Sequence, residues 1–402
     1  MEGNSTMATT AGSQGLSFSD KVIVIGGGLL ASFALSVLNP VLPKIDSALS
    51  HSPTDSMLVR QLFGFTSLAM AIGAPLGAYL ARIMGMRRML LCATLLYALA
   101  GTAGLYISSL PLLLVSRLLV GLTAAATQVM SLTLVNTKLE GVERAKWMGL
   151  HVSFATLITL AVSPLSGFLG NIGWQLPFAE YVIGLFLFAA LVFDKSGGSE
   201  IARRASDGSS VLSWFPWHYL PLSFLIGAVT FIPTAYGPFL LAEKVHLSPG
   251  KIGLVLMGSA GIGAIFASQY GRARKSLSAH QAFVVSFGLT GAGAAVAALA
   301  TSFPLLLAGL LAHSIGVGWF VPNIMTALGA KLTSEQQARA AGLVKTAHFS
   351  SAPICIYLKD TFLGQSGAST AMLTVSALSA SVVLAMAVRM ATGAKPTAFP
   401  AE

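Results

Sequence analysis

Charged residues are scarce in this chain. They make up 9% of the 402 residues, whereas 54% are hydrophobic and the mean hydropathy is +0.77. In an average soluble domain about a quarter of the residues are charged. A soluble protein breaks its apolar runs after about 10–14 residues, but several runs here reach the roughly 20 residues that a helix needs to cross about 30 Å of hydrocarbon. The scarcity of charge excludes an ordinary soluble domain and predicts a protein that lies in the lipid bilayer.

Residues that could carry catalysis or bind a metal are also few. The two cysteines, Cys92 and Cys355, fall within predicted membrane spans, where a thiol packs as a small apolar residue. The spans contain no His-Glu-x-x-His motif, no pair of central acids and no Ser/His/Asp set. We therefore predict no disulfide, no metal site, no cofactor and no enzymatic activity.

Carboxylates are missing from the middle of the predicted spans. All fourteen lie at or near loops or helix ends. Asp20, Glu180, Glu243 and Asp360 would be embedded only if the predicted helix ends were wrong by several residues.

The positive charges follow the pattern of a membrane protein rather than that of a nucleic-acid-binding protein. The net charge is +10, but the Lys and Arg residues are scattered over loops and form no single patch. With a cytoplasmic amino terminus, seventeen of the 24 lie in cytoplasmic loops, five lie on the opposite side, and Arg117 and Lys345 fall inside helices. This asymmetry predicts that both termini are cytoplasmic. Residues 1–20 lack the basic start and cleavage site of a secretory signal, so we expect the first helix to stay in the protein.

Apolar runs separated by polar breaks predict twelve membrane-spanning helices. Their predicted bounds are 21–43, 58–81, 88–108, 111–136, 144–169, 175–194, 217–241, 249–270, 278–300, 303–330, 337–359 and 366–390. Residues 194–216 turn abruptly to Ser, Gly and charge, which indicates a linker. The predicted parts are a cytoplasmic tail over 1–20, a bundle over 21–194, a cytoplasmic linker over 195–216, a second bundle over 217–391 and a tail over 392–402.

The two predicted bundles repeat one another. The segment Ser109-Leu-Pro-Leu-Leu-Leu matches Ser302-Phe-Pro-Leu-Leu-Leu at an offset of 193 residues, and Pro40 matches Pro233 at the same offset. The repeat indicates that the two halves have similar folds related by pseudo-symmetry.

A stretch rich in arginine joins the second and third predicted helices. It resembles the loop between helices 2 and 3 of the major facilitator superfamily, in which Gly, three residues, an acid, Arg, two residues, Gly, any residue and two basic residues follow one another. Ala81 stands where the family has the acid. The matching residues are Gly77, Arg82, Gly85, Arg87 and Arg88.

This resemblance implies an all-α membrane protein with twelve helices in two pseudo-symmetric six-helix bundles. It also implies a monomeric secondary transporter of a small molecule, with protons as coupling ion, that spans the bacterial inner membrane several times. Gly271 and Arg274 repeat Gly85 and Arg88 at an offset of 186 residues. Both gating loops are expected to help close the cytoplasmic side, held by Arg82 and helix packing because Ala81 offers no ion pair.

Two further motifs resemble the drug and metabolite:proton antiporters of the family. Arg117 and Gly121 match the helix-4 signature, which implies that Arg117 lines the cavity or takes part in proton coupling. Pro164 and Gly167 look like the remnant of the antiporter signature in helix 5, which favours export over uptake. A proline kink beside small residues is the structural alternative for that second motif.

The embedded polar residues are basic or neutral. A charge inside a membrane costs about 2.5–3.5 kcal/mol on insertion scales, so Arg117 and Lys345 are expected to face a wet cavity or a partner. The alternatives are that Arg117 pairs with a backbone carbonyl or snorkels to the interface, and that Lys345 snorkels to the cytoplasmic face. Histidines could replace the missing carboxylate as proton carriers, or could pack as hydrogen-bonded residues. They are His151, His313 and His348, and the possible cavity hydrogen-bonders are Asn39, Gln128 and Asn323.

The sequence thus predicts a transporter that works by alternating access. Embedded cations and the lack of central acids favour proton-coupled export of a small organic anion or amphipathic acid. Polyspecific efflux of hydrophobic drugs and proton-coupled uptake of a small metabolite are the alternatives. The substrate itself is not predicted.

Overall fold

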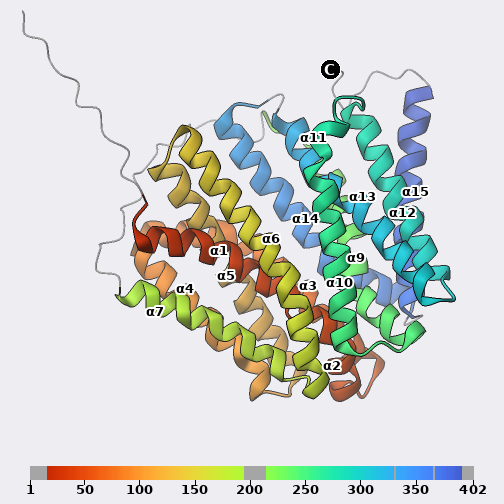
Figure 1. The fold of residues 1–402 in the computed structure, drawn as a ribbon, viewed down its shortest axis with the longest axis horizontal. Coiled ribbons are helices and arrows are strands. Elements are labelled where there is room, and N and C mark those ends of the chain that lie inside the picture. The colour runs from red at the N-terminus through yellow and green to blue at the C-terminus, as the bar shows by residue number, and fades with distance from the viewer. Residues whose placement is uncertain (1–15, 194–213, 330–331, 365–366, 392–402) are drawn as a thin grey trace, which may run out of the picture.

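The computed structural model describes residues 16–193, 214–329, 332–364 and 367–391 as a set of packed helices (Figure 1). Eleven helices within these ranges are long and apolar enough to cross a membrane. A further long helix, α14 (Ser334–Phe362), carries Lys345, Lys359 and Asp360, which make it more polar. The predicted all-α membrane fold is confirmed. The predicted linker lies almost wholly outside the described residues, as does the tail 392–402.

The first half of the chain forms one bundle, drawn from red to yellow-green in Figure 1. Its elements are α1 (Phe18–Ser36), η1 (Asn39–Val41), α2 (Leu42–Leu49), α3 (Pro53–Met84), α4 (Met86–Gly101), η2 (Thr102–Leu105), α5 (Leu110–Lys138), α6 (Gly141–Ile172), η3 (Leu176–Val182) and α7 (Ile183–Phe193).

The second half forms the other bundle, drawn from green to blue (Figure 1). Its elements are α9 (Tyr219–Val245), α10 (Pro249–Ser268), α11 (Tyr270–Ala273), α12 (Ala279–Leu299), α13 (Phe303–Gly329), α14 and α15 (Ala368–Ala391).

Two predicted boundaries were wrong for reasons of local hydrogen bonding. Residues 18–20, predicted as tail, form the first turn of α1, because Ser17 and Asp20 form a capping box that satisfies free N–H groups of that turn. The polar stretch between the first two spans, predicted to lie outside them, is mostly helical as well: α2 runs to Leu49 and α3 begins at Pro53, one of the positions where a helix accepts proline.

The predicted arginine-rich loop is a single residue. Arg82 lies in the last turn of α3, and Arg87 and Arg88 lie in the first turn of α4. Gly85 alone separates the two helices, with φ +85°, a conformation that side-chain-bearing residues rarely adopt. The reversal between α3 and α4 therefore depends on this glycine.

Small residues let α3 and α5 approach closely within the first bundle. A Cβ added at Gly121 would lie 2.3 Å from the Thr66 carbonyl oxygen, and one added at Gly77 would lie 2.6 Å from the Ala126 Cα. Such close approach is what holds helices together in lipid, where no hydrophobic force acts between them. Gly77, predicted as part of the gating loop, thus packs inside its own bundle.

The most extensive contacts between the two bundles are made by two helix pairs at one end of the molecule. Between α3 and α14, the Gln61 Nε2 donates to the Pro353 carbonyl at 3.0 Å. Between α6 and α10, a Cβ added at Gly167 would lie 2.3 Å from the Pro249 carbonyl oxygen. We call the end of the molecule where these contacts lie the Arg60 end, after a residue of α3 described below. The opposite end of α3 is called the Gly85 end.

A matched pair of glycine substitutions tests the packing of α3 on α5. Gly121→Ala is expected to destabilise the protein by about 1–3 kcal/mol, because the added methyl meets a backbone carbonyl that cannot move freely. At Gly149 of α6 nothing lies within 4 Å of an added Cβ, so Gly149→Ala is expected to stabilise the helix by up to about 1 kcal/mol. Thermal unfolding of the purified protein in detergent measures both, and equal shifts of the same sign would contradict the packing argument.

Candidate functional site

A cavity of about 610 Å³ lies between the two bundles. The first bundle contributes α1, η1, α3 and α6 to its wall, and the second contributes α9, α10 and α13. The volume lies within the range of roughly 300–1,000 Å³ that is common for small-molecule sites. Helices from both halves thus form one candidate substrate site.

The cavity wall is apolar with neutral hydrogen-bonding groups. No Lys, Arg, Asp or Glu is among the described residues that line it. Phe63 of α3 and Phe231 of α9 meet across the two halves, with ring centroids 5.6 Å apart in an edge-to-face arrangement. The polar lining residues are Ser36, Asn39, Thr159, Ser163, Thr230, Thr234, Ser259, His313 and Ser314.

Two of the predicted site residues line this cavity. Asn39 lies in η1, where the chain turns after α1. His313 of α13 is buried, and its Nδ1 lies 3.3 Å from the Thr290 carbonyl oxygen of α12. Gly263 and Ala267, which match Gly77 and Ala81 in the repeat, also belong to the wall rather than to a loop.

Lys345 and His348 lie one turn apart on α14, next to the wall. The His348 ring packs on Phe231, with centroids 4.7 Å apart. The Lys345 side chain is exposed, and its ammonium interacts electrostatically with His348 and with His151 of the other bundle. His151 itself is buried, with its Nδ1 2.7 Å from the Val24 carbonyl oxygen. Lys345 therefore brings a positive charge to the space between the bundles.

Arg117 lies outside the cavity lining, in the interior of the first bundle. Its side chain is fully buried, and its Nη2 donates to the carbonyls of Ala100 at 3.2 Å and Gly101 at 2.9 Å. These carbonyls end α4, where free C=O groups and the negative end of the helix dipole favour a cation. The guanidinium also lies 5.1 Å from the Phe178 ring centroid and 4.7 Å from that of Tyr181. Arg117 therefore pairs with backbone carbonyls, as in the alternative given in the sequence analysis, and does not line the cavity.

The remaining predicted residues are spread over the helices. Asn323 is buried and joins α13 to α11 and α12, because it accepts from the Tyr270 hydroxyl at 2.7 Å and donates to the Ala279 carbonyl at 2.9 Å. Gln128 is half-buried on α5 and is not among the lining residues. Arg87 donates to the Leu191 carbonyl of its own bundle at 3.1 Å.

Pro164 and Gly167, predicted as an antiporter-like motif, lie where α6 meets α10. A Cβ added at Gly253 of α10 would lie 2.3 Å from the Ser163 carbonyl oxygen and 2.9 Å from the Pro164 Cα. Both motif residues therefore take part in the closest contacts between the bundles.

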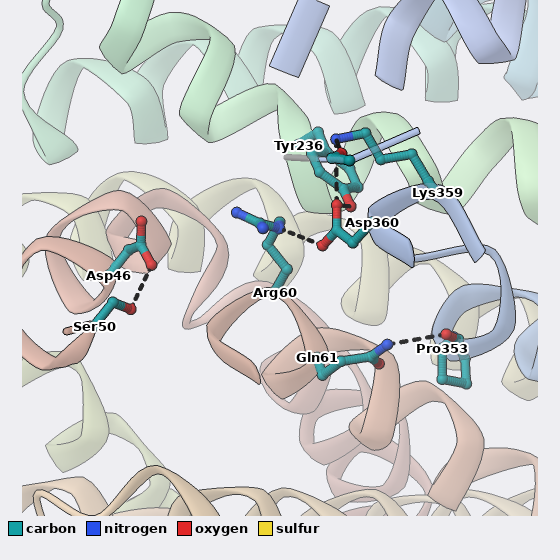
Figure 2. A network of polar contacts seen from close by, with 9 residues as sticks. Asp46, Ser50, Arg60, Gln61, Tyr236, Pro353, Lys359 and Asp360 are labelled. Carbon is teal, nitrogen blue, oxygen red and sulfur yellow. Dashed lines mark hydrogen bonds and ion pairs between the residues drawn. The ribbon is translucent and has the colours of Figure 1, made fainter. Parts of the chain in front are cut away.

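A buried cluster of opposite charges joins the bundles at the Arg60 end (Figure 2). The Arg60 Nε of α3 donates to Asp360 Oδ2 of α14 at 2.9 Å. The Tyr236 hydroxyl donates to Asp360 Oδ1 at 2.6 Å, and the Lys359 Nζ lies 3.2 Å from the same oxygen. The Arg60 guanidinium also lies over the rings of Tyr236 and Phe239. Asp360 is thus a buried carboxylate that ties three helices from both halves.

Sequence reasoning missed this cluster, because it placed Arg60, Lys359 and Asp360 at helix ends or in outer loops. In the structure α14 extends to Phe362, so Asp360 lies within the helix and is buried. The signal in the sequence was the occurrence of opposite charges at the same end of the second and eleventh helices. Because a buried charge requires a partner, those residues could have been paired.

Asp360→Asn is expected to shift the protein away from contact at the Arg60 end. The change removes the carboxylate that pairs with the buried Arg60, and loss of one partner of such a pair costs about 3–5 kcal/mol, so a shift of at least about tenfold in the ratio of the two states is expected. Distances between spin labels at Thr54→Cys and Phe362→Cys, in a background lacking Cys92 and Cys355, measure the opening. Glu143→Gln, which removes an exposed pair with Lys146, is the control. Unchanged distances in Asp360→Asn would contradict a latch at this position.

Comparison with known proteins places the fold. The model of the Major Facilitator Superfamily matches residues 24–243 and 219–401. The chain is 26% identical over 346 residues to the tetracycline resistance protein, class G, of Vibrio anguillarum. The aligned residues cover 80% of this chain and 84% of that protein. Among solved structures it is similar to a D-xylose–proton symporter (TM-score 0.74, 15% identity, 92% of this chain and 97% of that one) and to the nucleoside transporter NupG (TM-score 0.72, 13% identity, 92% and 99%). Since the family model spans nearly the whole chain, the protein belongs to the major facilitator superfamily and is a multi-pass membrane transporter, not an enzyme.

Proposed function

We propose that the protein exports an amphipathic organic acid through the central cavity by alternating access, in exchange for protons. The observation that carries this proposal is the cavity itself, which lies between the two bundles and combines aromatic walls with neutral hydrogen-bonding groups. Such a wall suits an apolar ring system that carries a few polar substituents.

The charge near the cavity favours an acid over a cation. No carboxylate is among the described lining residues, whereas the Lys345 ammonium is exposed one turn from His348, which backs Phe231. Since Arg117 contacts backbone carbonyls in its own bundle, the preference for an anion depends on Lys345. We infer that the apolar body of the substrate lies against Phe231 and that its anionic group lies toward Lys345.

The direction of transport is inferred from similarity to known transporters. The contacts that join α3 to α14 and α6 to α10 lie at the Arg60 end, so in this state we infer that the substrate reaches the cavity from the Gly85 end. The positive-inside pattern predicts that this end is cytoplasmic. Similarity to a tetracycline resistance protein supports export, because a transporter protects a cell by carrying a compound away. Similarity to a sugar–proton symporter keeps proton-coupled uptake as an alternative.

Polyspecific efflux of uncharged hydrophobic compounds is the second candidate. It is favoured by one observation, the lack of any charged residue among the described lining residues. The two candidates differ in the role of Lys345, because its ammonium stabilises a bound anion but contributes nothing to the binding of an uncharged substrate.

Lys345→Gln separates these candidates when two matched probes are used in proteoliposomes. Anilinonaphthalene sulfonate is an amphipathic anion, and N-phenylnaphthylamine has the same rings without the sulfonate. A charge-assisted hydrogen bond contributes about 1.5–3 kcal/mol, so Lys345→Gln is expected to lower transport of the sulfonate at least about tenfold and to leave the neutral probe unchanged. Lys251→Gln, at an exposed lysine at the start of α10, is the control. Equal transport of the sulfonate by Lys345→Gln and wild type would refute the anion proposal.

Phe231→Ala tests the cavity as the binding site. Loss of the ring that contacts Phe63 and His348 is expected to raise the Kd of both probes about 2- to 12-fold, as an aromatic contact contributes about 0.5–1.5 kcal/mol beyond area. Fluorescence titration measures the Kd. Phe362→Ala, at an exposed phenylalanine outside the cavity, should leave it unchanged. If both variants bind as wild type does, the substrate does not lie in this cavity.

A further inference from the structure

Glu180 is a buried carboxylate that no described residue neutralises. Both of its carboxylate oxygens are shielded from solvent and accept no hydrogen bond from the described residues. No Lys or Arg of the described chain lies within ion-pair distance of it. The other buried acids differ, since Asp360 pairs with Arg60 and Asp20 pairs with Lys138 at 2.7 Å. An ionised carboxylate in such a place is costly, and the group avoids the cost by holding a proton.

The cation Arg117 lies on another face of η3. In a 3₁₀ helix residues three apart share a face, and Phe178 and Tyr181 present their rings to Arg117. Glu180 lies on a different face of the same helix. The guanidinium donates through its Nη2 to the carbonyls that end α4, and its buried Nη1 forms no hydrogen bond with the described residues.

The other elements packed against η3 bring no positive charge to Glu180. The cations of α4, Arg87 and Arg88, lie in its first turn at the Gly85 end, and its Tyr97 is fully buried and donates to the Leu30 carbonyl at 2.9 Å. η2 and α7 contain no titratable residue, and those of α6 all precede Val152. Tyr181 of η3 itself donates to the Phe33 carbonyl at 3.4 Å. Among the described residues no positive charge is within ion-pair distance of Glu180, and Arg117 is the cation that shares Tyr97 and Tyr181 with it as neighbours.

Ser166 of α6 faces Glu180 and decides which way a hydrogen bond can run. Its hydroxyl lies near the carboxyl group with no hydrogen bond formed between them in this structure, and it donates its one proton to the Val162 carbonyl at 2.9 Å. A hydroxyl has a single donor and two acceptor lone pairs. Ser166 can therefore only accept from Glu180, and Glu180 can donate only when it is protonated.

The position of Ser166 connects Glu180 to the moving parts of the transporter. Ser166 lies three residues, about 4.5 Å along the axis, after Ser163, which lines the cavity. The carbonyl of Ser163 is also the group that Gly253 of α10 approaches most closely. Glu180 thus lies behind the cavity wall, at the point where α6 contacts the other bundle.

We propose that Glu180 is the proton-binding site of the transporter. It holds a proton as a neutral carboxylic acid beside Ser166 while α6 and α10 are in contact, as in this structure. When the bundles separate along α6 and α10, water at the Arg60 end reaches the group, and the hydrated carboxylate takes up a proton from hydronium there. The neutral acid is then enclosed as α6 and α10 return to contact, and transfer of its proton to water on the side of the Gly85 end leaves a carboxylate and completes the exchange. This inference rests on the proposed function in one respect, since it needs transport to be coupled to protons.

Glu180→Gln tests the proposal because glutamine keeps the shape and can donate to Ser166 but cannot release a proton. In proteoliposomes, exchange of labelled for unlabelled anilinonaphthalene sulfonate needs no net proton movement and should stay within about twofold of wild type. Transport driven by an imposed pH gradient should fall more than tenfold, and proton movement reported by an internal pH dye should be lost. Glu180→Asp should recover part of both. Glu143→Gln, at an exposed carboxylate near the start of α6, should behave as wild type.

An infrared measurement decides the protonation of Glu180 without any transport assay. The difference spectrum between wild type and Glu180→Gln in detergent should contain the C=O stretch of a protonated carboxylic acid. Because the replaced group is neutral, the variant should also unfold at a temperature no lower than that of wild type. Absence of that band, or gradient-driven transport of wild-type size in Glu180→Gln, would overturn the assignment. If wild type exchanges no probe at all, the proposed function fails, and the infrared band still decides the state of Glu180.

Discussion

The close contact between the two bundles at the Arg60 end is the constraint on which the rest of the structure depends. It is made by backbone meeting backbone, at Gly167 against Pro249 and at Gly253 against Ser163, where a single added methyl group would collide. Helices in lipid associate through such packing and through hydrogen bonds, since apolar side chains gain nothing by leaving a hydrocarbon solvent. The cavity exists because the bundles meet at this end and because small residues of α10 and α13 leave room beside it.

Charge in a medium of low dielectric is the second constraint, and the protein meets it in three different ways. Asp360 is neutralised by cations and a tyrosine hydroxyl from both halves, so its charge stabilises one arrangement of the bundles. Arg117 is held by carbonyls at the end of α4 and by two aromatic rings, so it ties together one bundle. Glu180 has neither kind of partner, and the physical answer for such a group is a change of protonation state. A buried charged side chain with an ion-pair partner stabilises one arrangement of the helices, whereas a buried carboxyl group without a partner changes its protonation state when water reaches it.

The motifs found in the sequence have local structural roles here. Gly85 adopts a positive φ that reverses the chain between α3 and α4, Gly77 packs on α5, and Gly167 packs on α10. These roles are compatible with a part in transport, since a helix that packs through glycine can also slide or rotate against its neighbour. The arginines of the predicted gating loop lie at the opposite end from the contacts between bundles described above. Their predicted part in closing that end remains a prediction.

The sequence by itself determined the fold, because hydropathy over about 20 residues and the repeat between the halves are local or periodic signals that need no knowledge of neighbours. It also predicted that Arg117 and Lys345 lie within helices, and they lie in α5 and α14. Only the tertiary structure decided what each embedded group faces, because the rotation of a helix about its axis and the choice of its partners are set by packing between helices distant in the chain. Thus His313 and Asn39 line the cavity, while Arg117 faces α4 and η3. The predicted helix ends were wrong by a few residues, because of the capping box at Ser17 and the extension of α14 to Phe362, and these errors did not change the predicted fold. They did change the predicted environment of the charged residues, because they concealed that Asp360 is buried opposite Arg60.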